Sequence, residues 1–260
     1  MKNLKGNLGN RLEKKELSRE KVELVDGNLC ELVGYEVKDY GFTEYVENIE
    51  ISNGQFRRSR SMIPFKYLDA DMTKFKWDVY GCDIALEKEK AESFITRFQE
   101  YQKCGKGLYI FSRTKGSGKT FLSCALANEV MERQDICVKF ISVPELLEMT
   151  KKSYKDFAKE EDLERVKGAD LLILDDIGTE TKKEWVDTEL FRMIDNRNNS
   201  RKVTIFTSNV EMDNLKLDDR IVDRIFETCI RIHLPEKPIR AMNADKENMK
   251  FMQKVLRTGT

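Results

Sequence analysis

The chain has 260 residues, and its 46 Lys and Arg side chains balance 46 Asp and Glu side chains, so the formal net charge is zero. With 35% charged and 40% hydrophobic residues, the composition is typical of a folded globular protein and argues against disorder. No apolar run approaches the roughly 20 residues that a membrane span needs, and the first residues lack the apolar stretch of a signal peptide. We therefore expect a cytoplasmic protein without membrane contact, in which any DNA contact comes from local patches.

The cysteine and histidine content argues against a metal-stabilised or disulfide-stabilised fold. The six cysteines are scattered without a CxxC pair, and the single histidine is His233. Zinc sites need clustered Cys and His ligands, and disulfides are rare in reducing compartments. We predict buried free thiols instead.

Two segments precede the regular part of the chain. Residues 1–55 are rich in charge, Gly and Asn, and a weak apolar periodicity in LEKKELSREKVELV suggests a small helical or mixed N-terminal module. Residues 56–83 begin with four cations and no acidic residue among them, Arg57, Arg58, Arg60 and Lys66. This run suggests a basic linker and an entry to the core, although a solvated charged surface explains it equally well.

From about residue 84 the pattern becomes regular, beginning with a helical spacing of apolar residues over 84–102. Short apolar runs typical of buried parallel strands follow, and amphipathic stretches fill the gaps between them. The predicted strands are 107–112, 137–142, 171–176, 203–208 and 229–234, and the predicted helices are 119–133, 144–152, 156–167 and 183–199. This alternation predicts an α/β fold with a parallel sheet over residues 84–240, with ligands at the carboxyl ends of the strands. Residues 241–260 are assigned to a C-terminal helical tail.

The strongest motif lies between the first predicted strand of this sheet and the helix that follows it. Glycines let backbone amides turn toward a phosphate, a helix N-terminus adds positive potential, a lysine reaches the β- and γ-phosphates, and a threonine hydroxyl binds Mg²⁺. We predict that the following residues bind a nucleotide: Lys115, Gly116, Ser117, Gly118, Lys119, Thr120 and Phe121. A plain turn between a strand and a helix is the alternative.

One position departs from the usual phosphate-loop pattern, G-x-x-x-x-G-K-[ST]. The first glycine of that pattern is Arg113 here. Because this glycine usually occupies a crowded turn, we expect Arg113 to adopt a different backbone conformation or to point outward.

A second motif, LLILDDIG, ends a predicted strand with Asp175 and Asp176. Alone, such a pair is more often a turn or a helix cap. Together with the phosphate loop, it predicts that Asp175 binds Mg²⁺ and that Asp176 orients the attacking water. Many related ATPases carry a longer Glu at the second position, so the shorter reach of Asp176 puts the rate of hydrolysis in doubt.

Three further polar residues are candidates for catalysis. Asn209 follows the fourth strand, where it could hold the attacking water, although alone it is better explained as a turn cap. Arg220 and Arg224 lie four residues apart on one helix face. They could form ion pairs within the chain or present an arginine to a nucleotide bound by a neighbouring subunit.

Over roughly residues 62–240, the chain carries in order the motifs GSGKT, LLILDDIGTE, VTIFTSN, DDRIVDRIFETCIRIHL and PIR. In this order of motifs, the chain resembles the DnaC/DnaI-type helicase loaders of the AAA+ superfamily, including those of phages. The resemblance implies a five-stranded AAA+ core that binds ATP and Mg²⁺, self-associates with ATP, and engages a hexameric replicative helicase and single-stranded DNA. It also implies that Asn209 is the first sensor and Arg224 the arginine finger, with Arg220 as the neighbouring candidate. Arg240 resembles the second sensor, although the family's Gly-x-Ser-x-Arg is EKPIR here. By the same resemblance, residues 1–55 are the candidate helicase-interaction module.

Two other functions stay open from the sequence. One is a related AAA+ ATPase that assists transposition. The other is a helicase-binding module with a degenerate nucleotide site that does not hydrolyse ATP, which the departures at Arg113 and Asp176 keep open.

For single-stranded DNA, the useful ingredients are basic residues with interleaved aromatics. The segment between the second and third strands of the parallel sheet offers Lys151, Lys152, Tyr154, Lys155 and Phe157. Acidic residues follow at once, and the aromatic spacing suits helix packing equally well.

Overall fold

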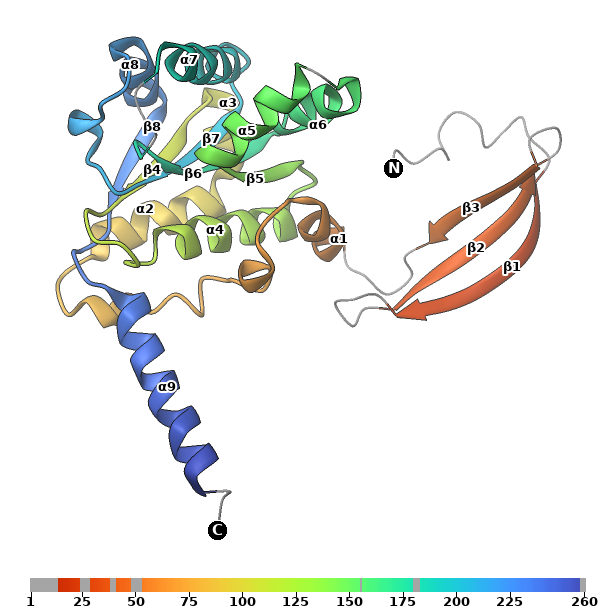
Figure 1. Ribbon diagram of the computed structural model, residues 1–260, viewed down its shortest axis with the longest axis horizontal. Helices are drawn as coiled ribbons and strands as arrows, with labels where there is room; N and C mark the ends of the chain where they lie inside the picture. Colours follow the sequence, from red (N-terminus) through yellow and green to blue (C-terminus); the bar gives the residue numbers. More distant parts are fainter. Residues whose placement is uncertain are drawn as a thin grey trace. The chain divides into compact units, whose positions relative to one another are not determined.

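The computed structural model describes residues 14–23, 29–37, 41–47, 53–154, 156–179 and 183–257 (Figure 1). The chain forms two compact units, Met1–Phe56 and Arg57–Thr260. Within the described ranges, no helix combines the length and the apolar character that crossing a membrane requires.

The described part of the first unit is a three-stranded antiparallel sheet. Its strands are β1 (Lys14–Glu23), β2 (Leu29–Val37) and β3 (Gly41–Glu47), in the order β1-β2-β3. The helical interpretation of LEKKELSREKVELV is therefore wrong, because most of that stretch is β1. Pairing with β2 overrides the weak helical spacing: Lys15 stands opposite Glu36, and Lys21 stands opposite Glu31.

The second unit contains the predicted α/β sheet. Its five strands are all parallel, in the order β5-β6-β7-β4-β8, which confirms the predicted five-stranded AAA+ core. The strands are β4 (Gly107–Phe111), β5 (Val138–Ser142), β6 (Leu171–Ile177), β7 (Val203–Ser208) and β8 (Cys229–His233). Each coincides with a predicted strand to within a residue at either end.

Helices cover both faces of this sheet (Figure 1). The helices of the described residues are α1 (Asn53–Arg60), α2 (Ala85–Thr96), α3 (Phe98–Cys104), α4 (Lys119–Arg133), α5 (Val143–Ser153), α6 (Phe157–Lys167), α7 (Glu184–Asn199), α8 (Asp219–Thr228) and α9 (Ile239–Arg257), with short 3₁₀ turns at Phe65–Tyr67, Trp77–Tyr80 and Met212–Asn214. The single helix expected over 84–102 is two helices, broken at Arg97, whose φ of −119° lies outside the helical range.

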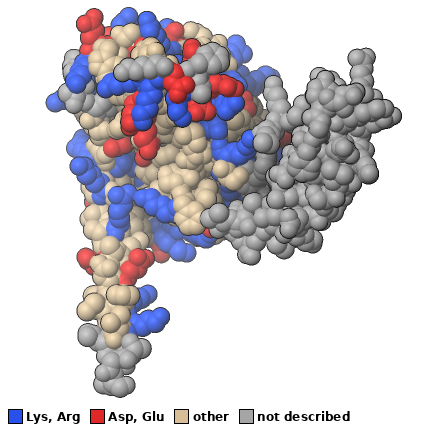
Figure 2. Space-filling view, turned by 45° about the vertical axis from the view of Figure 1, so that its right-hand side comes forward, with Lys and Arg blue, Asp and Glu red and all other residues tan. Residues whose placement is uncertain are grey.

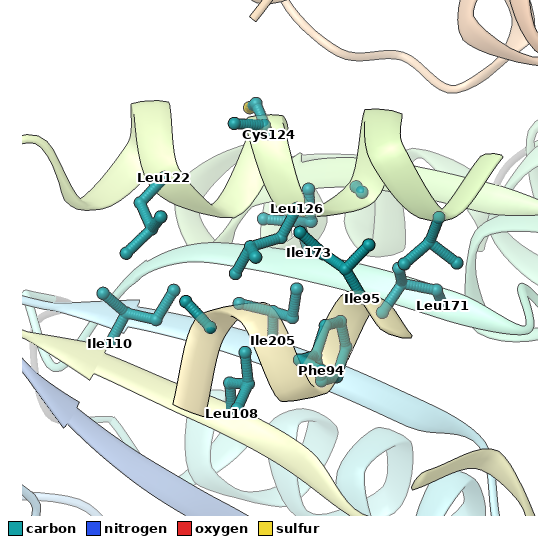
Figure 3. Close-up of a cluster of buried hydrophobic side chains, with 14 of the residues drawn as sticks. Phe94, Ile95, Leu108, Ile110, Leu122, Cys124, Leu126, Leu171, Ile173 and Ile205 are labelled. Carbon is teal, nitrogen blue, oxygen red and sulfur yellow. The ribbon is translucent and has the colours of Figure 1, made fainter. Parts of the chain in front are cut away.

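The core lies in two layers, one on each face of the sheet, because successive strand side chains point to opposite faces. Leu108 and Ile110 of β4 pack with α2 and α4, whereas Tyr109 and Phe111 pack with α5 to α8. Figure 3 shows the first layer, with Leu122 of α4 above the strand side chains. The sheet is thus buried on both faces, which explains its continuous apolar strands.

The segment interpreted as a basic linker belongs to the second unit and is anchored on α4. The amide of Asn128, a fully buried residue of α4, donates hydrogen bonds to the carbonyls of Tyr67, Leu68 and Ala70 at 3.0, 3.0 and 2.8 Å. Arg57 donates to the carbonyl of Gln134 at 2.7 Å, just beyond the end of α4. The segment therefore packs as a fixed layer on the core.

This packing also uses part of the predicted basic run. Arg57 forms an ion pair with Asp135 at 3.1 Å, and Arg58 forms one with Glu132 at 2.9 Å. Glu132 lies in the last turn of α4 and Asp135 lies just beyond its end, so these cations are not a free basic patch.

The cysteines whose side chains are described are free, but the prediction of buried thiols holds fully only for Cys124. Cys82, Cys104 and Cys137 are exposed, and Cys229 is half-buried. Within the described ranges, no group of three His, Cys, Asp or Glu side chains could by itself hold a metal ion.

Candidate functional site

The loop between β4 and α4 has the backbone that phosphate binding needs. Gly116 and Gly118 have φ angles of 73° and 103°, a left-handed conformation that other residues rarely adopt. A Cβ atom at Gly116 would lie 2.9 Å from Cβ of Arg240, and one at Gly118 would lie 3.2 Å from side-chain atoms of Phe75 and Tyr80. Both conformation and space therefore require glycine here.

The amides of this loop are available to a ligand. Among the described residues, no acceptor pairs with the backbone N–H groups of Gly116, Ser117, Gly118 or Lys119. Unpaired donors at the N-terminus of a helix are a binding site for an anion, because the helix dipole adds positive potential at the same point. The start of α4 is thus prepared for a phosphate group.

Lys119 lies inside this loop. Its Nζ donates hydrogen bonds to the carbonyls of Ser112 and Thr114, both at 3.1 Å, and to Oγ of Ser117 at 3.3 Å. Burial lowers the pKa of Lys119, and the nearby carboxylates of Asp176 and Glu236 act in the opposite direction. A polyphosphate would supply the compensating negative charge at close range.

The expectation for Arg113 is met. Its side chain is 71% exposed and forms an ion pair with Glu211 at 3.0 Å. Its φ is not positive, so it does not take the conformation for which glycine is usually required. The missing first glycine is thus accommodated by a side chain that points away from the loop.

A carboxylate that the sequence analysis did not single out holds the beginning of the loop. Glu236 accepts hydrogen bonds from the backbone N–H groups of Arg113 and Thr114, at 3.0 and 2.6 Å, and from the hydroxyl of Ser112 at 3.1 Å. Burial alone would raise the pKa of Glu236, but hydrogen bonds from Arg113, Thr114 and His233 lower it to about 2. Glu236 is therefore ionised at neutral pH and ties the loop to the segment before α9.

The acidic pair of β6 faces the loop across β7, which lies between β4 and β6 in the sheet. Oδ1 of Asp175 accepts hydrogen bonds from the hydroxyls of Thr120 at 3.0 Å and Thr207 at 2.6 Å. Burial raises the pKa of Asp175, which these hydroxyls oppose. Thr120 and Asp175 present hard oxygen donors side by side, which fits Mg²⁺, since this ion is usually held by one or two protein oxygens together with substrate phosphates.

Asp176 and Asn209, predicted separately as water-orienting residues, are in contact. Nδ2 of Asn209 donates a hydrogen bond to Oδ1 of Asp176 at 2.6 Å. The backbone N–H of Asp176 donates to the hydroxyl of Thr207 at 3.0 Å. The phosphate loop, the acidic pair and Asn209 therefore converge at the carboxyl ends of β4, β6 and β7, as this type of fold predicts.

The three arginine candidates separate into two groups. Arg240 lines the same cavity as the loop, and its backbone N–H donates to the carbonyl of Gly116 at 2.9 Å. Arg220 binds the carboxylate of Asp218 at 2.9 Å, and Arg224 binds Asp195 at 2.9 Å. Neither Arg220 nor Arg224 lines the cavity.

The phosphate loop, the acidic pair, Asn209 and Arg240 open into one cavity of about 560 Å³. It also has an aromatic and basic wall that the sequence analysis missed, contributed by the segment that Asn128 anchors. The missed lining residues are Tyr67, Lys74, Phe75, Lys76, Val79, Thr207, Ile239 and Asn243. The only available signal was the dense run of aromatics and lysines in FKYLDADMTKFKWDVY.

The DNA candidates between β5 and β6 are only partly described. Lys151 lies over the ring of Trp185, with Nζ 4.5 Å from the ring centroid, and Lys152 pairs with Glu148 at 2.7 Å. Tyr154 is 68% exposed. Lys155 and the side chain of Phe157 lie outside the described residues. On the face shown in Figure 2, basic and acidic side chains are interspersed over the upper part of the second unit.

Known proteins share this fold and these motifs. Replicative helicase loader DnaI of Bacillus subtilis (strain 168) is 32% identical over 166 residues, which cover 62% of this chain and 52% of the relative. Replicative helicase loader DnaC of Escherichia coli (strain K12) is 28% identical over 121 residues, covering 45% of this chain and 49% of the relative. The chain thus spans about half the length of these curated relatives.

A solved structure and a family model extend this likeness. The crystal structure of DnaI superposes with a TM-score of 0.57 at 30% identity, covering 67% of this chain and 95% of that chain. The model of the IstB-like ATP binding protein family matches residues 108–246, from β4 into α9. With its phosphate loop and five-stranded AAA+ core, the chain belongs to the IstB-like ATP-binding family.

Proposed function

We propose that this protein is an ATP-dependent loader that binds a replicative DNA helicase and delivers it onto single-stranded DNA. The observation that carries the proposal is the convergence of the open phosphate loop, the acidic pair and Asn209 in one cavity, in a chain whose relatives are named helicase loaders. The family description alone also fits a transposition helper, but these relatives favour the loader. The cytoplasmic location predicted from the sequence suits this role.

The proposed activity includes hydrolysis of ATP with Mg²⁺. Bound Mg²⁺ would neutralise the charge that develops on the phosphates, and Thr120 and Asp175 are the residues that would hold it. Lys119 and the loop amides bind the polyphosphate, and Arg240 lies beside them. We infer that Asp176 and Asn209 hold the attacking water, which their contact at 2.6 Å supports.

We further propose that ATP drives self-association, with an arginine contributed to the nucleotide of a neighbouring copy. Arg220 and Arg224 lie outside their own cavity, so any contact with a nucleotide must be to another subunit. The side chain of Arg220 is 67% exposed and that of Arg224 is 40% exposed. Both can exchange a surface carboxylate for a phosphate at small cost, since exposed ion pairs contribute little.

We propose that separate surfaces contact the helicase and the DNA. Residues 1–55 are the candidate helicase-interaction module, and the region of Lys151, Lys152 and Tyr154 is the candidate for single-stranded DNA. A protein with zero net charge gives weak general attraction to phosphates, so we expect DNA binding to depend on assembly with the helicase.

Co-purification tests the proposal. Tagged protein is incubated with a purified hexameric replicative helicase, with ATP or without nucleotide, and ATP turnover is measured with and without single-stranded DNA. We expect ATP-dependent recovery of the helicase and measurable turnover. Lys119→Ala should lose both, whereas Lys103→Ala, an exposed lysine at the end of α3, should behave as the original protein. Recovery that does not depend on ATP, with turnover absent, would instead favour the non-hydrolysing module.

A further inference from the structure

The pairing of β6 with β7 is interrupted where β6 carries the two aspartates. Regular register ends at Leu174 and resumes at Ile177, so Asp175 and Asp176 stand opposite Thr207 alone. Two residues opposite one define a β-bulge. Asp176 has a φ of 63°, a left-handed conformation that is uncommon for residues other than glycine.

The bulge explains how two consecutive carboxylates serve one site. In a regular strand, neighbouring side chains point to opposite faces of the sheet. Here both Asp175 and Asp176 line the cavity that contains the phosphate loop. A bulge redirects a side chain in this way, and bulges are frequent beside active sites.

One hydroxyl group holds the bulge together. Oγ1 of Thr207 accepts a hydrogen bond from the backbone N–H of Asp176 at 3.0 Å and donates its own hydrogen to Oδ1 of Asp175 at 2.6 Å. The side-chain oxygen thus takes the place of a main-chain acceptor in the interrupted ladder. Thr207 is 2% exposed, so water has little access to replace the hydroxyl.

The same contact fixes the oxygen that faces Thr120. Oδ1 of Asp175 is shared by the hydroxyls of Thr207 and Thr120, so the rotation of the Asp175 carboxylate is determined from both sides. Outer hydrogen bonds of this kind orient the ligands of a metal ion.

We propose that Thr207 is a positioning residue for metal binding and hydrolysis, acting through Asp175 and Asp176. The proposal rests on the proposed ATPase function and adds to it a residue that sets the direction of both carboxylates.

The chain offers closely matched variants for a test. Thr207→Val keeps the shape of the side chain but removes the hydroxyl, and Thr207→Ser keeps the hydroxyl. The control is Ser208→Ala: Ser208 is equally buried on the same strand, donates to the carbonyl of Ile177 at 2.6 Å and accepts from the N–H of Val210 at 3.0 Å. These two contacts do not involve either aspartate.

Three measurements are made on the full chain: ADP affinity in EDTA, Mn²⁺ affinity of the ADP complex by electron paramagnetic resonance, and ATP turnover with Mg²⁺. For Thr207→Val we expect Mn²⁺ affinity and turnover to fall at least about tenfold, with ADP affinity in EDTA unchanged, because the loop amides are untouched. Thr207→Ser and Ser208→Ala should stay close to the original protein in all three.

Two results would overturn the proposal. One is a Thr207→Val variant that keeps the Mn²⁺ affinity of the original protein, and the other is a Thr207→Ser variant that loses as much Mn²⁺ affinity as Thr207→Val. If the original protein does not hydrolyse ATP, the proposed ATPase function fails, but the Mn²⁺ comparison still decides the role of Thr207. If Thr207→Val does not fold, Thr207→Ala takes its place against Thr207→Ser in the same measurements.

Discussion

Asn128 offers a quantitative test of how the aromatic wall of the nucleotide cavity is held. This buried amide on α4 donates from Nδ2 to three carbonyls of the segment that carries Tyr67. Asn128→Leu removes these donors in a side chain with the same branching and the same number of heavy atoms. We expect the variant to have a lower free energy of unfolding and to hold this segment less firmly against α4.

The structure bounds the size of this loss. Nδ2 has two hydrogens, so three carbonyls share the equivalent of two full hydrogen bonds, each worth about 1 kcal/mol net, and stranding buried carbonyls adds about 1–3 kcal/mol. Oδ1 of Asn128 is buried without a partner among the described residues, so leucine loses nothing at that position. We therefore expect Asn128→Leu to cost about 3–5 kcal/mol.

Asn128→Asp should be worse at neutral pH. It places a carboxylate against three carbonyl oxygens, and an unpaired buried charge costs more than a missing donor. Lowering the pH should narrow the difference between the two variants, because a protonated carboxyl group regains one donor.

Urea unfolding followed by tryptophan fluorescence measures both effects. The two tryptophans, Trp77 and Trp185, belong to the second unit. In a Trp185→Phe background, Trp77 reports the anchored segment, where it packs on Phe75 with ring centroids 4.6 Å apart. In a Trp77→Phe background, Trp185 reports α7. We expect Asn128→Leu to shift the Trp77 transition to lower urea than the Trp185 transition. The reasoning would be refuted if Asn128→Leu changed the free energy of unfolding by less than about 0.5 kcal/mol, the usual size for a surface substitution. It would also be refuted if Asn128→Asp were as stable as Asn128→Leu at pH 7.

Further predictions concern Glu236 and the two arginines outside the cavity. Because hydrogen bonds lower the pKa of Glu236 from 4.5 to about 2, its contribution to stability is present above about pH 4.5 and lost as the pH falls toward 2. Between pH 7 and 2.5, the melting temperature of Glu236→Gln should thus fall less than that of the original protein. Parallel curves of melting temperature against pH would contradict this. Arg224→Ala should leave ATP affinity unchanged but reduce ATP-driven assembly, which light scattering measures. It should also lower ATP turnover by a factor of about 10³ or more. Arg220→Ala serves as the neighbouring comparison, and unchanged assembly and turnover in both variants would exclude a trans role for this helix face.

The parts of the fold that were predictable are those encoded by neighbouring residues. The helix predicted at 119–133 coincides with α4, because a helix that follows a glycine-rich loop has a sharp beginning. Each strand of the parallel sheet is a continuous apolar run, since both of its faces are buried. Strands β1 to β3 carry no such run, and their pairing could not be seen in single segments.

The parts of the site that were missed depend on contacts between distant residues. The segment that carries Tyr67, Phe75 and Val79 is held on the core by Asn128, about sixty positions later, which binds three of its carbonyls. Glu236 reaches Arg113 across 123 positions. Such pairs follow no local periodicity, so the sequence identified the loop but not the residues that enclose it.

Two departures from the usual motifs kept a degenerate nucleotide site open, and the structure gives a physical account of each. Arg113 directs its charge to Glu211, outside the loop, while its backbone N–H is taken by Glu236. Asp176 is shorter than the usual glutamate, but the bulge turns it into the cavity, where Asn209 contacts it at 2.6 Å. Neither departure removes a donor or a carboxylate from the cavity. Since the loop amides, Lys119 and both carboxylates all line the cavity, they support the proposed ATPase rather than the alternative of a helicase-binding module with a degenerate nucleotide site.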